Sequence, residues 1–216
     1  MTQDIPPAIP DETGYAELQV SSNFSFLRGA SHAEELVLSA ATKGLHAIAI
    51  TDRNSLAGVV RGHSAHAHYK DRLNYVVGCR IDPVDAPSLL CYPTDRAAYA
   101  RLCRLLTVGK RRAPKGSCEI YLSDILDHAE GQLFIVVPPQ VPDDAFRLEL
   151  VRLQGYFAGK IWLAVGRFMD GFDSERLAFT EAVETDLGIP AVVTNDVHMH
   201  LRSRKPLQDV LTCIRH

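Results

Sequence analysis

The sequence lacks several features that would assign a function directly. Its five cysteines include no CxxC pair, whereas a zinc ribbon or a disulfide framework requires closely spaced, paired thiols. No apolar run approaches the roughly 20 residues of a membrane span, and residues 1–12 are acidic and proline-rich, unlike a signal peptide. A P-loop, a nucleophile elbow and a GxGxxG motif are also missing. We therefore predict a cytoplasmic protein with reduced cysteines and no membrane partner.

What the sequence does contain is typical of a folded globular domain. It has 216 residues, of which 46% are hydrophobic and 23% charged, which is enough to build the core of one domain. A net charge of −3 and a pI near 6.3 argue against nucleic-acid binding over the whole surface. We expect a flexible arm over residues 1–14, then one domain over residues 15–216 whose last helix is cut short by the end of the chain.

Short apolar strands alternate with helices along the chain. The strands are expected at 15–20, 46–51, 74–78, 88–92, 133–137, 160–165 and 191–194. The helices are expected after a capping box at 31–34, then at 55–70, 94–108 (ended by Gly109), 123–129, 142–154 and 174–187, and from Pro206 onward. This alternation indicates parallel βα units and an α/β fold. Without a dinucleotide motif, about seven such strands favour an irregular (β/α) barrel over an open doubly wound sheet.

Polar residues follow several predicted strands, at the end of a (β/α) barrel where active sites lie. Asp196 and His198 are two residues apart in a segment expected to be extended. Their side chains would then point to the same side and could ligate one metal. Asp52 follows the second strand, where capping of the next helix is at least as good an explanation as ligation.

Two further clusters of titratable residues stand out. Six lysines and arginines occur between residues 101 and 115 with no acidic residue among them. A solvated loop explains such a run, and contact with a phosphate or a nucleic acid through Lys110, Arg111, Arg112 and Lys115 is the alternative. Histidines at 63, 66 and 68 fall on a predicted outer helix, where a solvated face is a better explanation than a metal site.

Several segments resemble the PHP (polymerase and histidinol phosphatase) domain. They are residues 21–31 (SSNFSFLRGAS), 50–58 (ITDRNSLAG), 77–80 (VGCR), 194–198 (TNDVH) and 206–214 (PLQDVLTCI). Residues 89–96 (LLCYPTDR) and 108–112 (VGKRR) are typical of the branch that opens the bacterial error-prone, C-family (alpha-subunit-like) DNA polymerases. The resemblance covers about residues 15–216. It implies a distorted (β/α)7 barrel whose strand ends hold divalent metals that hydrolyse phosphoesters.

Most of the metal-ligand positions implied by this resemblance carry other residues in this sequence. The replaced positions are Gln19, Ser21, Arg53, Arg80, Ser88 and Ala164, while Asp52, Asp196 and His198 retain ligand side chains. Glutamine and serine bind divalent metals weakly, and arginine adds permanent positive charge. The two arginines are expected to pair with Asp52 and Asp196. We therefore expect no cofactor, with zinc or manganese as the metal if one is retained.

The resemblance implies one leading function and leaves two alternatives. The leading hypothesis is a structural module of an error-prone polymerase that performs DNA-directed nucleotidyl transfer in damage tolerance and translesion synthesis. Its partners would be the remainder of that polymerase and, through it, DNA. No catalytic residue is assigned, because the paired aspartates of a polymerase palm are not recognisable in this sequence. The first alternative is a metal-dependent phosphoesterase or 3′–5′ exonuclease using Asp52, Asp196 and His198, and the second is a DNA-contacting module built on the basic run.

Overall fold

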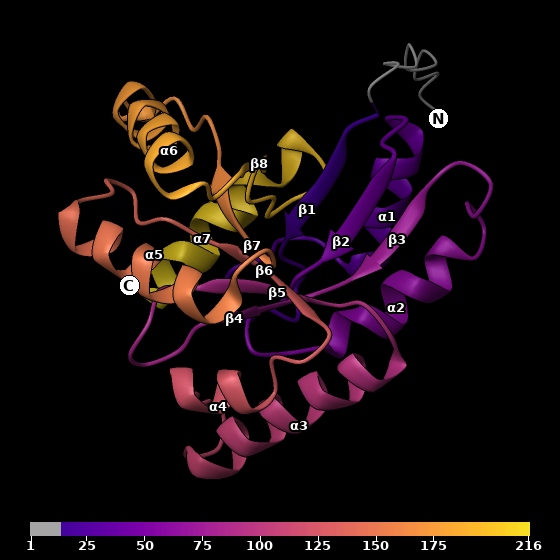
Figure 1. The fold of residues 1–216 in the computed structure, drawn as a ribbon. Helices are drawn as coiled ribbons and strands as arrows, with labels where there is room; N and C mark the ends of the chain where they lie inside the picture. The colour runs from indigo at the N-terminus through magenta and orange to yellow at the C-terminus, as the bar shows by residue number, and fades with distance from the viewer. Residues whose placement is uncertain (1–13) are drawn as a thin grey trace. The chain divides into compact units, whose positions relative to one another are not determined.

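A computed structural model describes residues 14–216 of the chain (Figure 1). The predicted arm over residues 1–14 therefore lies outside the described residues, apart from Gly14. The chain divides into two compact units. The first consists of the residues up to Gly78 together with Asp196–His216, and the second consists of Cys79–Asn195.

The first unit is built on a three-stranded parallel sheet. Its strands are β1 (Ala16–Val20), β2 (Ala47–Ile50) and β3 (Asn74–Val77), in that order across the sheet. Its helices are α1 (Ala33–Thr42), α2 (Ala57–His66), the short 3-10 helix η1 (Arg202–Arg204) and α7 (Lys205–Arg215). Val197 extends the sheet beyond β1, because it forms a parallel bridge with Val20.

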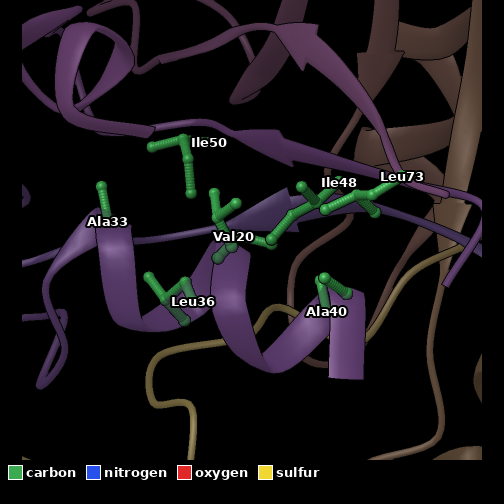
Figure 2. Close-up of a cluster of buried hydrophobic side chains, with 9 residues drawn as sticks. Val20, Ala33, Leu36, Ala40, Ile48, Ile50 and Leu73 are labelled. Carbon is green, nitrogen blue, oxygen red and sulfur yellow. The ribbon is translucent and has the colours of Figure 1, made fainter. Parts of the chain in front are cut away.

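The core of this unit lies between α1 and one face of the sheet. Leu36 and Ala40 of α1 face Val20 of β1 and Ile48 of β2, and all four side chains are buried (Figure 2). The helix places an apolar side chain toward the sheet at every third or fourth residue, as an amphipathic helix does. Alternate residues of β1 point away from this core. Polar side chains at those positions therefore do not disturb the apolar packing.

The second unit contains a mixed five-stranded sheet. Its strands, in their order across the sheet, are β4 (Cys79–Ile81), β5 (Leu89–Pro93), β6 (Gln132–Val136), β7 (Ile161–Val165) and β8 (Ala191–Val193). Its helices are α3 (Arg96–Arg112), α4 (Leu122–Asp127), α5 (Asp144–Phe157) and α6 (Asp173–Leu187). The rings of Phe134 on β6 and Phe157 on α5 pack with their centroids 4.4 Å apart. As predicted, α6 ends at Gly188, which adopts the left-handed conformation.

The structure supports the α/β class but corrects the prediction of parallel strands closing into one barrel. Within residues 14–216 the strands form two open sheets. The β4–β5 and β5–β6 pairs are antiparallel, so the second sheet is mixed. The sequence also predicts no strand at β4, because three residues are too few to show a strand period.

Two predicted helix boundaries are wrong for identifiable reasons. Helix α1 begins one residue later than its predicted capping box: His32 occupies the N-cap, and its backbone N–H donates to Glu35 Oε2 at 2.9 Å. Helix α3 is capped by Asp95 rather than Thr94, and it continues past Gly109 to Arg112. A side chain at Gly109 would collide with Ile120 and would lie 2.8 Å from Cys118 Sγ. This glycine therefore permits close packing and does not end the helix.

Among the helices of residues 14–216, none combines the length and the apolar character needed to cross a bilayer.

Candidate functional site

The Asp52 carboxylate lies at the centre of a buried hydrogen-bond network in the first unit. Asp52 follows β2, and its side chain reaches the loop that follows the parallel neighbour β1. Its Oδ1 accepts hydrogen bonds from the backbone N–H of Ser22 at 2.8 Å and from the Ser25 hydroxyl at 2.7 Å. Its Oδ2 accepts from the Ser22 hydroxyl at 2.7 Å. Ser25 Oγ also accepts from the backbone N–H of Arg53 at 3.1 Å, which ties the two loops together.

The carboxylate is also enclosed by the first turn of α2. A Cβ atom at Gly58 would overlap Asp52 Oδ2 and would lie 2.9 Å from Ser22 Oγ. Only 1% of the Asp52 surface is exposed. Burial raises the pKa of Asp52 above its ordinary value, and the hydrogen bonds from Ser25 and Ser22 partly oppose that rise. The structure therefore places Asp52 in a closed polar pocket of its own chain rather than at the N-cap of α2, which is Leu56.

Asp196 and His198 flank the residue that joins the edge of β1. The backbone N–H of Val197 donates to the Gln19 carbonyl, and the Val197 carbonyl accepts from the N–H of Ser21, both at 2.8 Å. Asp196 itself is not extended, because its φ is +45°. Asp196 therefore lacks the extended backbone from which a common direction of the Asp196 and His198 side chains was predicted.

The His198 ring is held by its own loop. Its Nδ1 lies 2.6 Å from the carbonyl oxygen of Asp196. Since a carbonyl only accepts, Nδ1 carries the proton in this contact, and in the corresponding neutral tautomer the lone pair is on Nε2. A metal-ligating histidine is commonly oriented in this way, so His198 alone retains the features of a ligand.

The residues at the predicted metal positions do not fit a metal cluster. Among residues 14–216, no three His, Cys, Asp and Glu side chains are grouped so that they could hold a metal ion. Asp52, Asp196 and His198 are therefore not assembled as a ligand set, although all three lie in the first unit. The Asp52 carboxylate is occupied by serine donors, which a metal would have to displace.

Strand β1 carries a row of buried polar side chains. Gln19 and Ser21, at two replaced ligand positions, are 3% and 4% exposed, and Glu17 two residues earlier is 3% exposed. Glu17 accepts from the Tyr15 hydroxyl at 2.8 Å and from the backbone N–H of Gln19 at 3.0 Å. Glu17 is not among the residues predicted from the sequence, although its spacing of two from Gln19 is the strand period that predicts a shared face.

Two other replaced ligand positions, Arg80 and Ser88, form a cluster in the second unit. Arg80 Nε lies 3.1 Å from Asp82 Oδ1, and Arg80 Nη2 donates to Ser88 Oγ at 3.2 Å. The Ser88 hydroxyl donates to the same Asp82 oxygen at 2.5 Å. Arg80 thus pairs with Asp82, a partner that the sequence did not predict, while the expected pairing of Arg53 stays a prediction.

The basic run does not form a solvated loop, because α3 includes residues up to Arg112. Arg112 donates to both carboxylate oxygens of Asp124, at 2.6 and 2.9 Å, and its guanidinium lies 5.0 Å from the centre of the Tyr121 ring. Lys110, Arg111 and Lys115 are exposed. Of the four predicted contact residues, Arg112 therefore has a structural role within its own unit.

The histidines at 63 and 66 lie on α2, as predicted, whereas His68 lies beyond its end. The rings of His63 and His66 are 6.4 Å apart, and each packs near the Tyr75 ring. His66 Nε2 lies 2.6 Å from the Leu73 carbonyl. This arrangement is a packing contact between α2 and the end of the chain segment that leads into β3.

Comparisons with solved structures show which folds resemble this chain. An amidohydrolase from Chromobacterium violaceum, solved with bound sulfate and no metal, matches with a TM-score of 0.65 at 13% identity over 86% of this chain and 88% of that one. A lesion-specific endonuclease from Pyrococcus furiosus matches with a TM-score of 0.55 at 14% identity over 86% of this chain and 48% of that one. At these identities the likeness shows a shared fold alone.

Comparisons of sequence identify the family. The error-prone DNA polymerase of Caulobacter vibrioides is 55% identical over 202 residues, which cover 93% of this chain and 18% of that protein. Error-prone DNA polymerase 1 of Agrobacterium fabrum is 46% identical over 94% of this chain and 18% of that protein. The chain thus spans about a fifth of the length of these relatives. The model of the PHP domain matches residues 17–179, and the chain belongs to the PHP domain family.

Proposed function

We propose that this chain is the PHP domain of a bacterial error-prone, C-family DNA polymerase and serves that enzyme as a structural module. The proposal is supported by 55% identity over 93% of the chain to a polymerase of which the match covers only 18%. The polymerase activity in DNA damage tolerance would then belong to the remaining part of the protein. A cytoplasmic location is part of the same proposal.

The observation that supports the structural role is that side chains at the predicted ligand positions are hydrogen-bonded to other groups of the chain. The Asp52 oxygens are occupied by donors from Ser22 and Ser25, and Arg80 and Ser88 are bound to Asp82. Each of these contacts uses hydrogen-bonding capacity that a metal or a phosphoester would need. Buried polar groups that already have their partners stabilise a fold, so these residues now hold their loops and strands together.

A surface suited to contact with the rest of a polymerase lies on α7. Leu207, Val210 and Ile214 are 43%, 55% and 63% exposed, and their spacing of three and four places them on one face of the helix. Phe26, which is 84% exposed, lines a hollow of about 210 Å³ together with Leu207 and Leu211. Contiguous exposed apolar side chains of this kind mark interaction sites, which supports the remaining polymerase polypeptide as the partner.

The experiment that tests the structural role measures metal and hydrolysis together. The 216-residue chain is produced in medium supplemented with zinc and manganese, dialysed without chelator and analysed by mass spectrometry. We expect metal far below one equivalent and no hydrolysis of bis-p-nitrophenyl phosphate when either metal is added. Near-stoichiometric metal, with hydrolysis that is lost in Asp52→Asn and in His198→Ala, would overturn the proposal.

The second candidate function is a metal-dependent phosphoesterase or 3′–5′ exonuclease. One observation favours it: His198 Nδ1 is engaged by the Asp196 carbonyl, which leaves Nε2 able to bind a metal. In this candidate Asp52, Asp196 and His198 would hold zinc or manganese, and the metal would supply an activated water. It requires the serine donors on Asp52 to be displaced, so Ser22→Ala and Ser25→Ala should raise metal uptake if it is correct.

A further inference from the structure

Helix α3 concentrates positive charge within a chain that is acidic as a whole. It contains six lysines and arginines over residues 96–112 and no acidic residue, whereas the whole sequence has a net charge of −3. Its other face is apolar and buried, with Ala98, Leu102, Leu105 and Leu106 packed into the second unit. Helix α3, labelled in Figure 1, is therefore amphipathic: one face is buried in the core of its unit and the other face is basic.

Two of the six basic residues attach the helix to its own unit. Arg101 Nε donates to the Glu130 carbonyl at 2.8 Å, and its Nη1 lies 3.3 Å from the Glu130 carboxylate. Arg112 is bound by Asp124 at the other end. These contacts fix the helix at two points 11 residues apart.

The remaining basic residues are exposed and form a line. Arg96, Arg104, Lys110 and Arg111 are exposed, and the structure records no hydrogen bond or ion pair between their side chains and any residue of 14–216. Arg96, Arg104 and Arg111 are separated by eight and seven residues, close to two helical turns each, so they share one face. At 1.5 Å per residue their backbone positions are about 12 and about 10 Å apart along the helix axis.

This line of charges fits a polyanionic backbone better than other partners. The residues between the arginines on the same face are Ala100 and Thr107, and the one large exposed apolar residue of α3 beside the stripe is Val108, which is 37% exposed. A helix that binds a membrane surface needs several such side chains for insertion, and a protein interface needs buried anchor residues. A DNA backbone presents closely spaced phosphates that neutralise lysine and arginine without any apolar contact.

We propose that the exposed stripe of α3, defined by Arg96, Arg104 and Arg111 with Lys110 beside it, binds the sugar-phosphate backbone of duplex DNA without reading its sequence. Of the residues predicted from the sequence, Lys110 and Arg111 belong to this surface, and Lys115 follows the end of α3 by three residues. Arg112 does not contribute, because Asp124 holds it. This inference goes beyond the structural role proposed above and does not depend on whether the Asp52 site binds metal.

The test compares two triple variants with equal loss of charge. The stripe variant is Arg96→Gln/Arg104→Gln/Arg111→Gln, and the control is Lys70→Gln/Lys160→Gln/Arg167→Gln, which changes three other exposed basic residues. Binding to a fluorescent 30-base-pair duplex of mixed sequence is followed by anisotropy with the full 216-residue chain. Salt is varied from 50 to 200 mM. Circular dichroism checks that both variants keep the helical content of the parent chain.

We expect the stripe variant to bind at least about tenfold more weakly at 50 mM salt, and its log–log salt slope to fall by up to about 3, since each phosphate contact contributes about 0.9. The control variant loses the same net charge as the stripe variant but keeps the stripe. It should therefore bind within about twofold of the parent chain. Equal losses in the two variants, or no binding by the parent chain at 50 mM, would overturn the proposal. Displacement of the duplex by an equal concentration of a poly-glutamate peptide would also overturn it and would indicate an acidic protein partner.

Discussion

Two carboxylates near the predicted metal-ligand positions, Asp52 in the first unit and Asp82 in the second, are bound by different kinds of donor. In the first unit a buried carboxylate, Asp52, accepts hydrogen bonds from serine hydroxyls and a backbone N–H and faces no cation among these donors. In the second unit a carboxylate, Asp82, faces the permanent cation of Arg80, whose side chain is 11% exposed against 28% for Asp82. The first arrangement depends on exclusion of water and complete hydrogen bonding, and the second on charge pairing near the surface.

This difference shows that two carboxylates of one chain can be satisfied by different kinds of donor. Neutral donors cannot offset the desolvation of Asp52, so its pKa is raised by burial. A guanidinium satisfies both the charge and the hydrogen bonds of its partner. The Asp52 network should therefore be far more sensitive to substitution than the Arg80 cluster.

The largest effect is expected when the Asp52 carboxylate is removed. Asp52→Ala leaves the Ser22 N–H and the hydroxyls of Ser22 and Ser25 without their acceptor in a buried site, which should lower the free energy of unfolding by about 3 kcal/mol. Asp82→Ala should cost about 1 kcal/mol, because the Asp82 side chain is partly exposed and Arg80 keeps its hydrogen bond to Ser88. Urea denaturation followed by circular dichroism measures both. Equal losses would show that the two clusters do not differ as described.

A smaller loss is expected when the space beside Asp52 is filled. Gly58→Ala places a methyl group against Asp52 Oδ2 and Ser22 Oγ, and such overpacking should cost about 2 kcal/mol. Gly155→Ala, also in a helix, is the matched control, because a Cβ there meets nothing within 4 Å. The control should be neutral or should stabilise the chain by up to about 1 kcal/mol. A Gly58→Ala variant as stable as this control would mean that the Asp52 pocket is not closed by α2.

The Arg80–Asp82 pair can be measured by a double-mutant cycle. Combining Arg80→Ala with Asp82→Ala should give a coupling energy of about 1 kcal/mol, reduced in high salt. Lys205 and Asp209 on α7, whose side chains are 62% and 54% exposed at 2.6 Å, provide a control pair with an expected coupling of about 0.3 kcal/mol. If the two pairs couple equally, partial burial adds nothing to the Arg80 cluster.

The smallest and most specific effect is the pH dependence of stability. The pKa of Asp52 is raised in the folded chain, so the folded state binds this proton more tightly than the unfolded state. Relative to Asp52→Asn, the parent chain should gain stability as the pH falls from 7 through the raised pKa, until the pH lies below the ordinary carboxyl pKa.

Asp124 provides the opposite case. The hydrogen bonds from Arg112 lower the pKa of Asp124, so the stability that it contributes is present above the ordinary carboxyl pKa and is lost as the pH falls through the lowered one. Urea midpoints of Asp52→Asn and Asp124→Asn, each compared with the parent chain between pH 7 and pH 3, should therefore diverge in opposite directions. Slopes of the same sign would contradict the burial of Asp52 as the dominant cause.

Elements with a local sequence signal were predictable in this protein, and elements without one were not. The strand before Asp52 and the helix ended by Gly188 were predictable, because a run of apolar residues and a left-handed glycine are local signals. The antiparallel β4–β5 pair was not, since Cys79–Ile81 is only three residues long. The sequence predicts that Gly109 ends the helix, but α3 continues to Arg112. The sequence does not show that Ile120 packs against this glycine.

The candidate site was predictable in its positions and not in its contacts. Asp52, Arg80 and Ser88 were singled out by a resemblance, yet nothing local to them indicates that Ser25 or Asp82 is the partner. The serines at 22 and 25 follow one parallel strand and Asp52 follows its neighbour, and this is the signal that could have joined them. Arg112 and Arg111 are adjacent in sequence, but only the fold brings Asp124 to one of them.

The sequence by itself determined the α/β class and the family resemblance, because these depend on local patterns and on residue identity. The tertiary structure decided which polar groups meet: serines with Asp52, Asp82 with Arg80, and Asp124 with Arg112 rather than with the residues of the α3 stripe. These pairings join residues between 2 and 30 positions apart. The geometry of a hydrogen bond is fixed only when the packed core holds both partners within about 3 Å of each other.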